Sequence, residues 1–530
     1  MSSRGRPPCA EGVVRAAPEK PGCGKREQPW VLAVAILGSS IAFNDDAFVS
    51  VALPAIQREV VETVRGMQWV VNVNSLMLGA LILVGGAAGD RFGLRRMFLL
   101  GMIIFAAASL GCALAPDAAW LISARAAQGV GGALLVPSCL ALISTNFAKG
   151  ERGRAFGTWA AFSALASAIA PVVGGWAVDA LSWRVVFLIN LPIALATIVI
   201  ACWRVPESRK ESERAAPDWA GGALATVGLA ALAYALTEAS NLGWAHSAVI
   251  GALAAGVAAA AAFIWLERRL DAPMLPLELF RSTTFSGTNA LTFLLYFALS
   301  GALFFVPLNF IQVQGYSAFE AGAAFLPFTV IMGGLSRWAG VLMDRHGART
   351  PLIVGPVVTA AGFGLLAVRG IGGSYWTSFL PAMAVLGLGM AVSVAPLTTA
   401  VMGAVPDRRS GVASGINNAV ATIAALFAVA LLGTIAVATF GGALERRMDA
   451  LQIAPEARNA MRLEVPKLAE AKAPSAIDQE QRRRLQSALH ESFVESFRIS
   501  MYLAAALSLL SAVAAALTIS PRKDARRKSE

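Results

Sequence analysis

The sequence predicts an all-α polytopic membrane protein built from a duplicated bundle of helices. Of its 530 residues, 56% are hydrophobic and only 15% are charged, whereas soluble domains carry about 25% charged residues. Apolar runs of about 20 residues, the length that crosses the hydrocarbon core of a bilayer, recur along the chain. A charged turn of pattern GxxxDRxGxR occurs twice between such runs, at 86–95 and 340–349. Repeated units of this kind are typical of membrane transporters.

The apolar runs define the elements in order. We expect fourteen membrane-spanning helices, near 30–54, 67–89, 97–115, 119–147, 155–178, 183–203, 218–238, 246–266, 284–311, 318–343, 350–369, 376–402, 411–439 and 498–520. Residues 1–29 are polar and rich in Pro, Gly and basic residues, and the run that follows them is long enough to span. No cleavable signal peptide is therefore expected.

The distribution of basic residues predicts the orientation of the chain. Seventeen Lys and Arg residues lie in the short connectors on the amino-terminal side, and four lie in the opposite short connectors. Short cytoplasmic loops carry the excess of basic residues, so we expect both termini in the cytoplasm. The net charge of +11 is concentrated in these connectors and in the tails, which argues against a nucleic-acid partner.

One outer connector, 440–497, is long and highly charged, and long loops are exempt from the charge rule. Its segment 475–478 resembles a helix start. Leu485, Leu489 and Phe493 then recur at helical spacing. We expect an extracytoplasmic helical hairpin on the last two spans, with a structural role.

The repeated turn predicts a conformational switch. Small residues allow membrane helices to approach closely, which is the role expected for the first glycine of each copy. The aspartate falls where the helix leaves the membrane, and the arginines offer ion-pair partners. We expect a charge latch, that is, ion pairs at this turn that hold the two halves in one conformation and break in the other. The alternative is an ordinary basic loop. The residues concerned are Gly86, Asp90, Arg91, Gly93 and Arg95 in the first copy, and Gly340, Asp344, Arg345, Gly347 and Arg349 in the second.

Charged residues inside the first and fourth spans predict a coupling site for a proton or substrate. Asp45 and Asp46 lie in the first span and Arg125 in the fourth, and an ionisable residue in a membrane helix is a functional hypothesis by default. The alternatives are a wet interface for the acids and snorkelling for Arg125. Adjacent residues diverge by about 100° around a helix, so only one of the two acids can point squarely into a cavity.

Further polar and helix-bending residues complete the predicted site. Candidates for a cavity or substrate contact are Ser50, Asn72, Asn74 and Gln128. Asp46 shares a helix face with Ser50, and this more polar face favours Asp46 over Asp45 as the acid that points into the cavity. Pro171, Gly174 and Gly175 predict a bendable, closely packed hinge in the fifth span; the alternative is a kink without a mechanistic role. The sequence contains no phosphate-binding loop, metal-ligand cluster or nucleophile elbow, so we expect no metal, no cofactor and no enzymatic activity.

Together these segments resemble the major facilitator superfamily, and most closely its fourteen-helix drug–proton antiporters. The resemblance covers about residues 30–520. Its patterns are LDxTIVNVALP at 45–54, the turn motif in both copies, RxxxGxG at 125–131, GPxxGG at 170–175, and WRxxFxxNxP at 183–192. In the first pattern the conserved aspartate aligns with Asp45, and the resemblance therefore favours Asp45 as the coupling acid.

The resemblance implies an organisation and a function. It implies six-helix bundles at 30–205 and 271–520, with two inserted transmembrane helices between them at 206–270. The tails at 1–29 and 521–530 are expected in the cytoplasm, and the first of them is expected to be disordered. The resemblance also implies export of small amphipathic or hydrophobic compounds such as drugs, driven by a proton gradient through alternating access. We expect a monomer in the cytoplasmic membrane whose partners are the substrate, protons and the lipid bilayer. An uptake symporter or facilitator on the same fold is the alternative.

The chain departs from the family patterns at four positions. Ala47 replaces a usual Thr, Ser50 a usual Asn and Ala170 a usual Gly. Asn72 stands where some exporters of cationic drugs carry a carboxylate, which argues against dicationic substrates.

Overall fold

The computed structural model describes residues 26–61, 63–147, 152–207, 218–270, 273, 275–405, 410–474 and 478–519. This part of the chain is almost entirely helical and contains no strand. The first group of elements is α2 (Gln28–Ile56), η1 (Gln57–Val61), α3 (Val64–Phe92), α4 (Leu94–Ala113), α5 (Ala118–Asn146), α6 (Arg152–Ala180), α7 (Val185–Leu188) and α8 (Asn190–Arg204).

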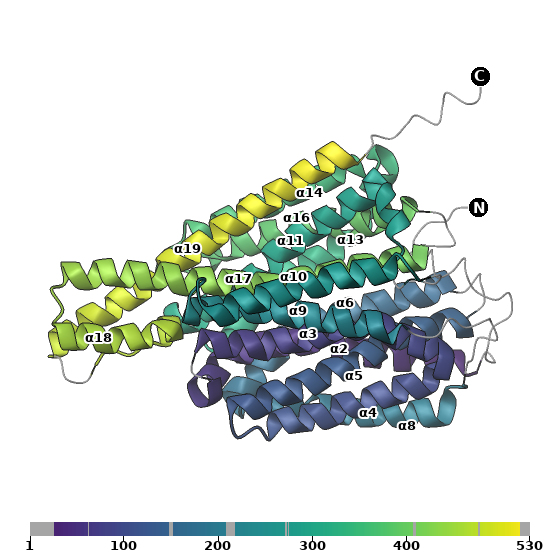
Figure 1. The fold of residues 1–530 in the computed structure, drawn as a ribbon, viewed down its shortest axis with the longest axis horizontal. Coiled ribbons are helices and arrows are strands. Elements are labelled where there is room, and N and C mark those ends of the chain that lie inside the picture. The colour runs from purple at the N-terminus through teal and green to yellow at the C-terminus, as the bar shows by residue number, and fades with distance from the viewer. Residues whose placement is uncertain are drawn as a thin grey trace.

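The remaining elements form an inserted pair and a second group. The pair is α9 (Trp219–Leu242) and α10 (Ser247–Glu267). The second group is η2 (Leu277–Arg281), α11 (Thr283–Leu308), η3 (Asn309–Val313), α12 (Ala318–Ala323), α13 (Leu326–His346), α14 (Arg349–Ala367), α15 (Tyr375–Ser378), α16 (Leu380–Gly403), α17 (Ser410–Ala450), α18 (Pro455–Glu464), η5 (Val465–Glu470) and α19 (Gln479–Thr518). Figure 1 shows the two groups as neighbouring halves.

Twelve helices in the described ranges are long and apolar enough to cross a membrane. They coincide with twelve of the fourteen predicted spans. The other two predictions, 67–89 and 155–178, fall in α3 and α6, which are helical but are not among the twelve. The count of fourteen therefore stays a prediction, whereas the multi-pass helical class is confirmed.

The two copies of the repeated turn have the same backbone shape. Gly93 has a φ of 107° between α3 and α4, and Gly347 has a φ of 76° between α13 and α14. A side chain is strained at such positive φ values, whereas glycine adopts them readily. The glycine of each DRxG sequence thus ends one long helix and allows the next to begin.

The first helix of each half ends in a π-helical turn that follows a proline. Pro54 precedes η1, and Pro307 precedes η3. Proline supplies no backbone N–H, and π-turns accommodate such breaks in the hydrogen-bond ladder. Gln312 Nε2 donates a hydrogen bond to Gln57 Oε1 at 2.7 Å, so the two turns meet at the boundary between the halves.

The described residues of 440–497 form a projection of helices, whereas residues 475–477 of the predicted helix start lie outside the described part of the chain. Helices α17 and α19 are 41 and 40 residues long, and Figure 1 shows them leaving the bundle together, with α18 beside them. Asp478 caps α19 by accepting a hydrogen bond from Gln481 N at 2.7 Å. Leu485, Leu489 and Phe493 are buried.

The projection also contacts the first half. Gln57 Nε2 donates to Lys467 O at 2.9 Å, and Arg58 pairs with Glu470 at 2.9 Å. These contacts join η5 to η1, so the last connector bridges the two halves at one end of the bundle.

The inserted pair bridges the halves along their length. Helix α9 packs against α10, against α3 of the first half and against α17 of the second. Buried Glu238 pairs with Arg65 of α3 at 2.6 Å. On the other side, Thr434 of α17 donates to Leu236 O at 2.6 Å.

Candidate functional site

Arg125 of α5 lies at the centre of a buried polar cluster in the first half. Its side chain has no exposure to solvent, and each of its three guanidinium nitrogens donates a hydrogen bond. Nη1 contacts Asp45 and also Gln128 Oε1 at 2.7 Å, Nη2 contacts Asp46 Oδ1 at 3.0 Å, and Nε contacts Val70 O at 3.0 Å. Burial of a charge is tolerated when it is paired and fully hydrogen-bonded. Arg125 therefore does not snorkel to an interface.

Asp45 of α2 is enclosed by this cluster. Its side chain is 1% exposed. Besides Arg125, its carboxylate accepts hydrogen bonds from Gln128 Nε2 at 2.9 Å and Asn190 Nδ2 at 3.0 Å. Gln128 Nε2 also contacts Ser109 Oγ at 2.9 Å. The alternative of a fully wet acid is thus wrong for Asp45, which is held inside protein.

Asp46 has a different environment from its neighbour. Its side chain is 50% exposed, and it accepts a hydrogen bond from Asn74 Nδ2 at 3.2 Å. Asp46 lines the cavity between the halves, whereas Asp45 does not. The family register favoured Asp45 as the coupling acid, and that role stays a prediction. The local polarity of the helix face, which favoured Asp46, gave the correct orientation.

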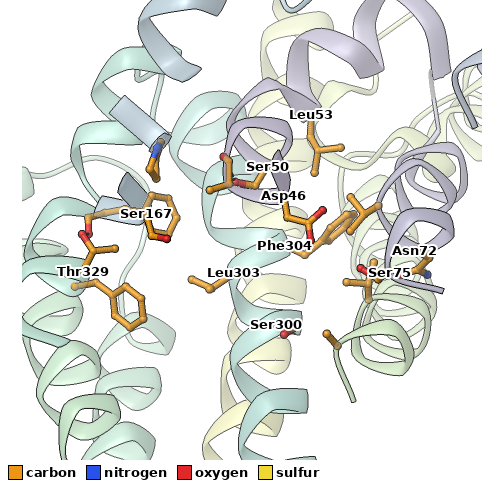
Figure 2. Close-up of a pocket in the computed structure, with 17 residues that line it drawn as sticks. Asp46, Ser50, Leu53, Asn72, Ser75, Ser167, Ser300, Leu303, Phe304 and Thr329 are labelled. Atoms are coloured by element: carbon orange, nitrogen blue, oxygen red, sulfur yellow. Dashed lines mark hydrogen bonds between the residues drawn. The ribbon is translucent and has the colours of Figure 1, made fainter. Parts of the chain in front are cut away.

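A cavity of about 260 Å³ lies between the two halves. Its wall from the first half contains most of the polar lining residues, and Figure 2 shows Asp46, Ser50, Asn72, Ser75 and Ser167 around it. The wall from the second half is mainly apolar and is formed by Ser300, Leu303, Phe304, Phe325, Phe328, Thr329, Ala425 and Val429. One polar and one aromatic wall suit an amphipathic ligand.

The predicted cavity residues divide into two groups. Ser50 and Asn72 line the cavity. Asn74 and Gln128 do not line it, and they support Asp46 and Asp45 instead. The second-half wall has no sequence signal, because a phenylalanine in an apolar helix looks the same whether it faces lipid, core or cavity. Asn190 belongs to the WRxxFxxNxP pattern at 183–192, but its contact with Asp45 was not predicted.

The two glycines of the proline motif lie at close helix contacts of α6, Gly175 against α12 of the second half and Gly174 against α2 of the first. A Cβ atom on Gly175 would lie 2.2 Å from Ala318 O, and one on Gly174 would lie 3.0 Å from Phe48 Cδ1. Next to them Asp179 accepts hydrogen bonds from the backbone N–H groups of Ala318 at 3.0 Å and Phe319 at 2.7 Å. Helix α6 continues through Pro171. The motif is thus a close contact between the halves at one end of the cavity.

The structure describes part of the predicted latch. Arg95 donates to Cys202 O at 2.9 Å, and Arg349 donates to Ala516 O at 2.8 Å. In each half this arginine therefore joins the start of one helix to the end of another. The predicted latch contacts of four further residues lie outside the part of the chain whose contacts the structure describes: Asp90, Gly340, Asp344 and Arg345.

The close helix approach predicted for Gly86 is made by its neighbour. A Cβ atom on Gly86 would be at an ordinary 3.7 Å from Pro137 Cβ, whereas one on Gly85 would lie 2.1 Å from Ala133 O. The expectation for Gly86 was therefore wrong by one residue, which is a rotation of about 100° around the helix.

No group of three His, Cys, Asp or Glu residues within the described ranges has the arrangement of a metal site. The chemistry available at the cavity is that of charge, hydrogen bonding and apolar contact. Two halves around a shared cavity define the class of a membrane transporter.

Comparison with known proteins identifies the family. The Major Facilitator Superfamily model matches residues 35–429. The chain is 35% identical over 425 residues to the multidrug resistance protein Stp of Mycobacterium tuberculosis, with 80% of this chain and 79% of Stp covered. It is 31% identical over 517 residues to the tetracenomycin C resistance and export protein of Streptomyces glaucescens, with 96% and 95% covered. It is 34% identical over 411 residues to the puromycin resistance protein pur8 of Streptomyces alboniger, with 77% and 81% covered.

Solved structures show the same fold. A bacterial homolog of the human lysosomal transporter Spinster, inward-facing and occupied, matches with a TM-score of 0.67 at 16% identity, covering 94% of this chain and 97% of that one. A D-xylose-proton symporter matches with a TM-score of 0.60 at 17% identity, covering 93% and 98%. The chain belongs to the Major Facilitator Superfamily, as its motifs predicted. It is a multi-pass membrane transporter and not an enzyme.

Proposed function

We propose that this transporter exports small amphipathic compounds, drugs among them, in exchange for protons. The observation that carries the proposal is the arrangement of Asp45, Asp46 and Arg125, in which a single guanidinium is shared by a buried acid and a cavity-facing acid. The resistance proteins among the relatives support the direction of transport. The polar and aromatic walls of the cavity support an amphipathic substrate.

The charge balance of the site supports proton coupling. Two carboxylates and one guanidinium carry a net charge of −1, so the addition of one proton makes the cluster neutral. Asp46 opens to the cavity and Asp45 is enclosed. We assign proton exchange to Asp46, because water in the cavity reaches it. Asp45 then holds Arg125 in place both when Asp46 takes up a proton and when Asp46 releases it.

The wider organisation fits alternating access. The contact of Gly175 and Asp179 with α12 closes one end of the cavity. The repeated DRxG turns act as conformational switches on the helices that they join. We place both termini in the cytoplasm and the protein, as a monomer, in the cytoplasmic membrane, on the grounds of the seventeen-to-four distribution of basic residues. The two inserted helices stay associated with both six-helix bundles.

Inverted membrane vesicles test the proposal directly. An exporter accumulates fluorescent amphipathic dyes in vesicles with an acid lumen, and nigericin, which collapses the pH gradient, abolishes this accumulation. Asp46→Asn should still bind dye but lose the response to the gradient. Accumulation that ignores the gradient would exclude antiport. Movement of dye out of an acid lumen would instead indicate the uptake symporter.

A further inference from the structure

Asn72 is a buried amide without a hydrogen-bond partner in the wall of the cavity. The residue is 1% exposed and lines the cavity from α3. Neither its Oδ1 nor its Nδ2 atom has a partner. Among the described residues it alone has both atoms of a side-chain amide buried and unpaired. Buried polar groups in proteins are nearly always hydrogen-bonded, so an exception needs a reason.

In the other amides of α3 the nitrogen has a partner, although Gln68 Oε1 and Asn74 Oδ1 do not. Asn74 Nδ2 contacts Asp46, and Gln68 Nε2 donates to Val429 O at 2.7 Å. Asn72 lies on the same side of the helix as Ser75, three residues further on, and Figure 2 shows the two beside each other at the cavity. Its lack of a partner therefore reflects its position facing the cavity.

The lining of the cavity suits an uncharged aromatic ligand. Asp46 is the one carboxylate among the lining residues, and it shares Arg125 with Asp45. The opposite wall offers the rings of Phe304, Phe325 and Phe328. A planar neutral molecule would therefore find aromatic surface on one side and an unpaired amide on the other.

We propose that Asn72 is a specificity-determining residue that binds the polar edge of an uncharged aromatic substrate. Its amide offers a donor beside an acceptor, so it pairs with a ligand group that presents an acceptor beside a donor, such as a primary carboxamide, a lactam or a carbamate. The ligand supplies the hydrogen bonds that this buried amide lacks. This inference rests on the proposed export of amphipathic compounds and names their chemical class.

Two matched probes test the inference on the full-length protein in detergent. Naphthalene-2-carboxamide has both the donor and the acceptor, and its N,N-dimethyl analogue lacks the donor. The wild-type protein should bind the primary amide more tightly. In Asn72→Leu, which keeps the branched shape of the side chain, binding of the primary amide should weaken about tenfold, and the preference over the analogue should disappear. Asn72→Asp should instead gain affinity for the cationic 2-(aminomethyl)naphthalene.

Thermal stability separates a binding role from a structural one. Asn72→Leu removes an unpaired buried amide, so its melting temperature should be unchanged or higher. The matched control is Asn289→Leu, because Asn289 contacts Asn417 at 3.1 Å and Phe285 O at 2.9 Å; its melting temperature should fall. A lower melting temperature for Asn72→Leu, with equal loss of both probes, would overturn the inference. So would a preference for the primary amide that survives in Asn72→Leu.

Failure of this inference is distinguishable from failure of the proposed function. If the wild-type protein transports dyes in response to a pH gradient but does not discriminate between the two probes, the inference alone is refuted. If it discriminates between the probes through Asn72 but ignores the gradient, the substrate class stands and proton coupling is refuted.

Discussion

Replacement of Arg125 by Met tests the arrangement of the site most severely. The substitution keeps much of the side-chain volume but leaves the carboxylate of Asp45, 1% exposed, without a cation. Breaking a buried ion pair on one side costs about 3–5 kcal/mol, whereas replacing both partners by neutral groups is often close to neutral. Arg125→Met should therefore destabilise the protein by about 3–5 kcal/mol, and Arg125→Met/Asp45→Asn should recover most of that loss.

The neighbouring acid supplies the matched control. Asp46 also pairs with Arg125, at 3.0 Å, but its side chain is 50% exposed, and exposed ion pairs contribute only about 0–1 kcal/mol. Arg125→Met/Asp46→Asn should therefore remain as unstable as Arg125→Met. Denaturant unfolding in detergent, followed by tryptophan fluorescence, gives the comparison as a double-mutant cycle. Equal rescue by Asp45→Asn and Asp46→Asn would refute the assignment of Asp45 as the buried partner.

Three further predictions address the contact between the halves, the switch and the topology. Gly175→Ala should force α6 away from a backbone carbonyl of α12, and we expect it to lower the free energy of unfolding by about 1–3 kcal/mol and to impair transport. In Gly174→Ala the added methyl group meets a side-chain ring, so both effects should be smaller in the same unfolding and vesicle assays. Asp90→Ala should slow turnover with little change in dye affinity, because it changes the populations of conformations and not the contacts of the substrate; lost affinity with normal turnover would contradict the switch. A cysteine at Ala473 should react with an impermeant thiol reagent from outside the cell and one at Lys210 should not, and reversed labelling would reject the topology.

The class of the protein and several helix ends were predictable because they depend on local sequence. Apolar runs of spanning length require helices, since the bilayer core offers no hydrogen bonds to the backbone. The glycine in each DRxG sequence marks a break because positive φ is open to it. The pairing of the acids with Arg125 was also foreseeable in outline, since a charge inside a membrane helix requires a partner.

The direction in which each residue faces was less predictable. Asp45 and Asp46 differ by about 100° around α2, and packing by the neighbouring helices decides which of them is enclosed. The same uncertainty explains the exchange of Gly86 for Gly85. In a soluble helix the polar face identifies the exposed side, but in a membrane both the lipid side and the core side are apolar. The aromatic wall around Phe304 therefore carried no sequence signal.

The projecting helices have a practical consequence for imaging. A helix of 41 residues is about 60 Å long, roughly twice the thickness of the hydrocarbon core. Helices α17 and α19 run without a break from the bundle into the projection, and the contacts of Gln57 with Lys467 and of Arg58 with Glu470 tie the projection to the first half as well. Small membrane proteins without mass outside the micelle are difficult to align in electron cryomicroscopy. Here the projection serves as an intrinsic fiducial for the alignment of single particles.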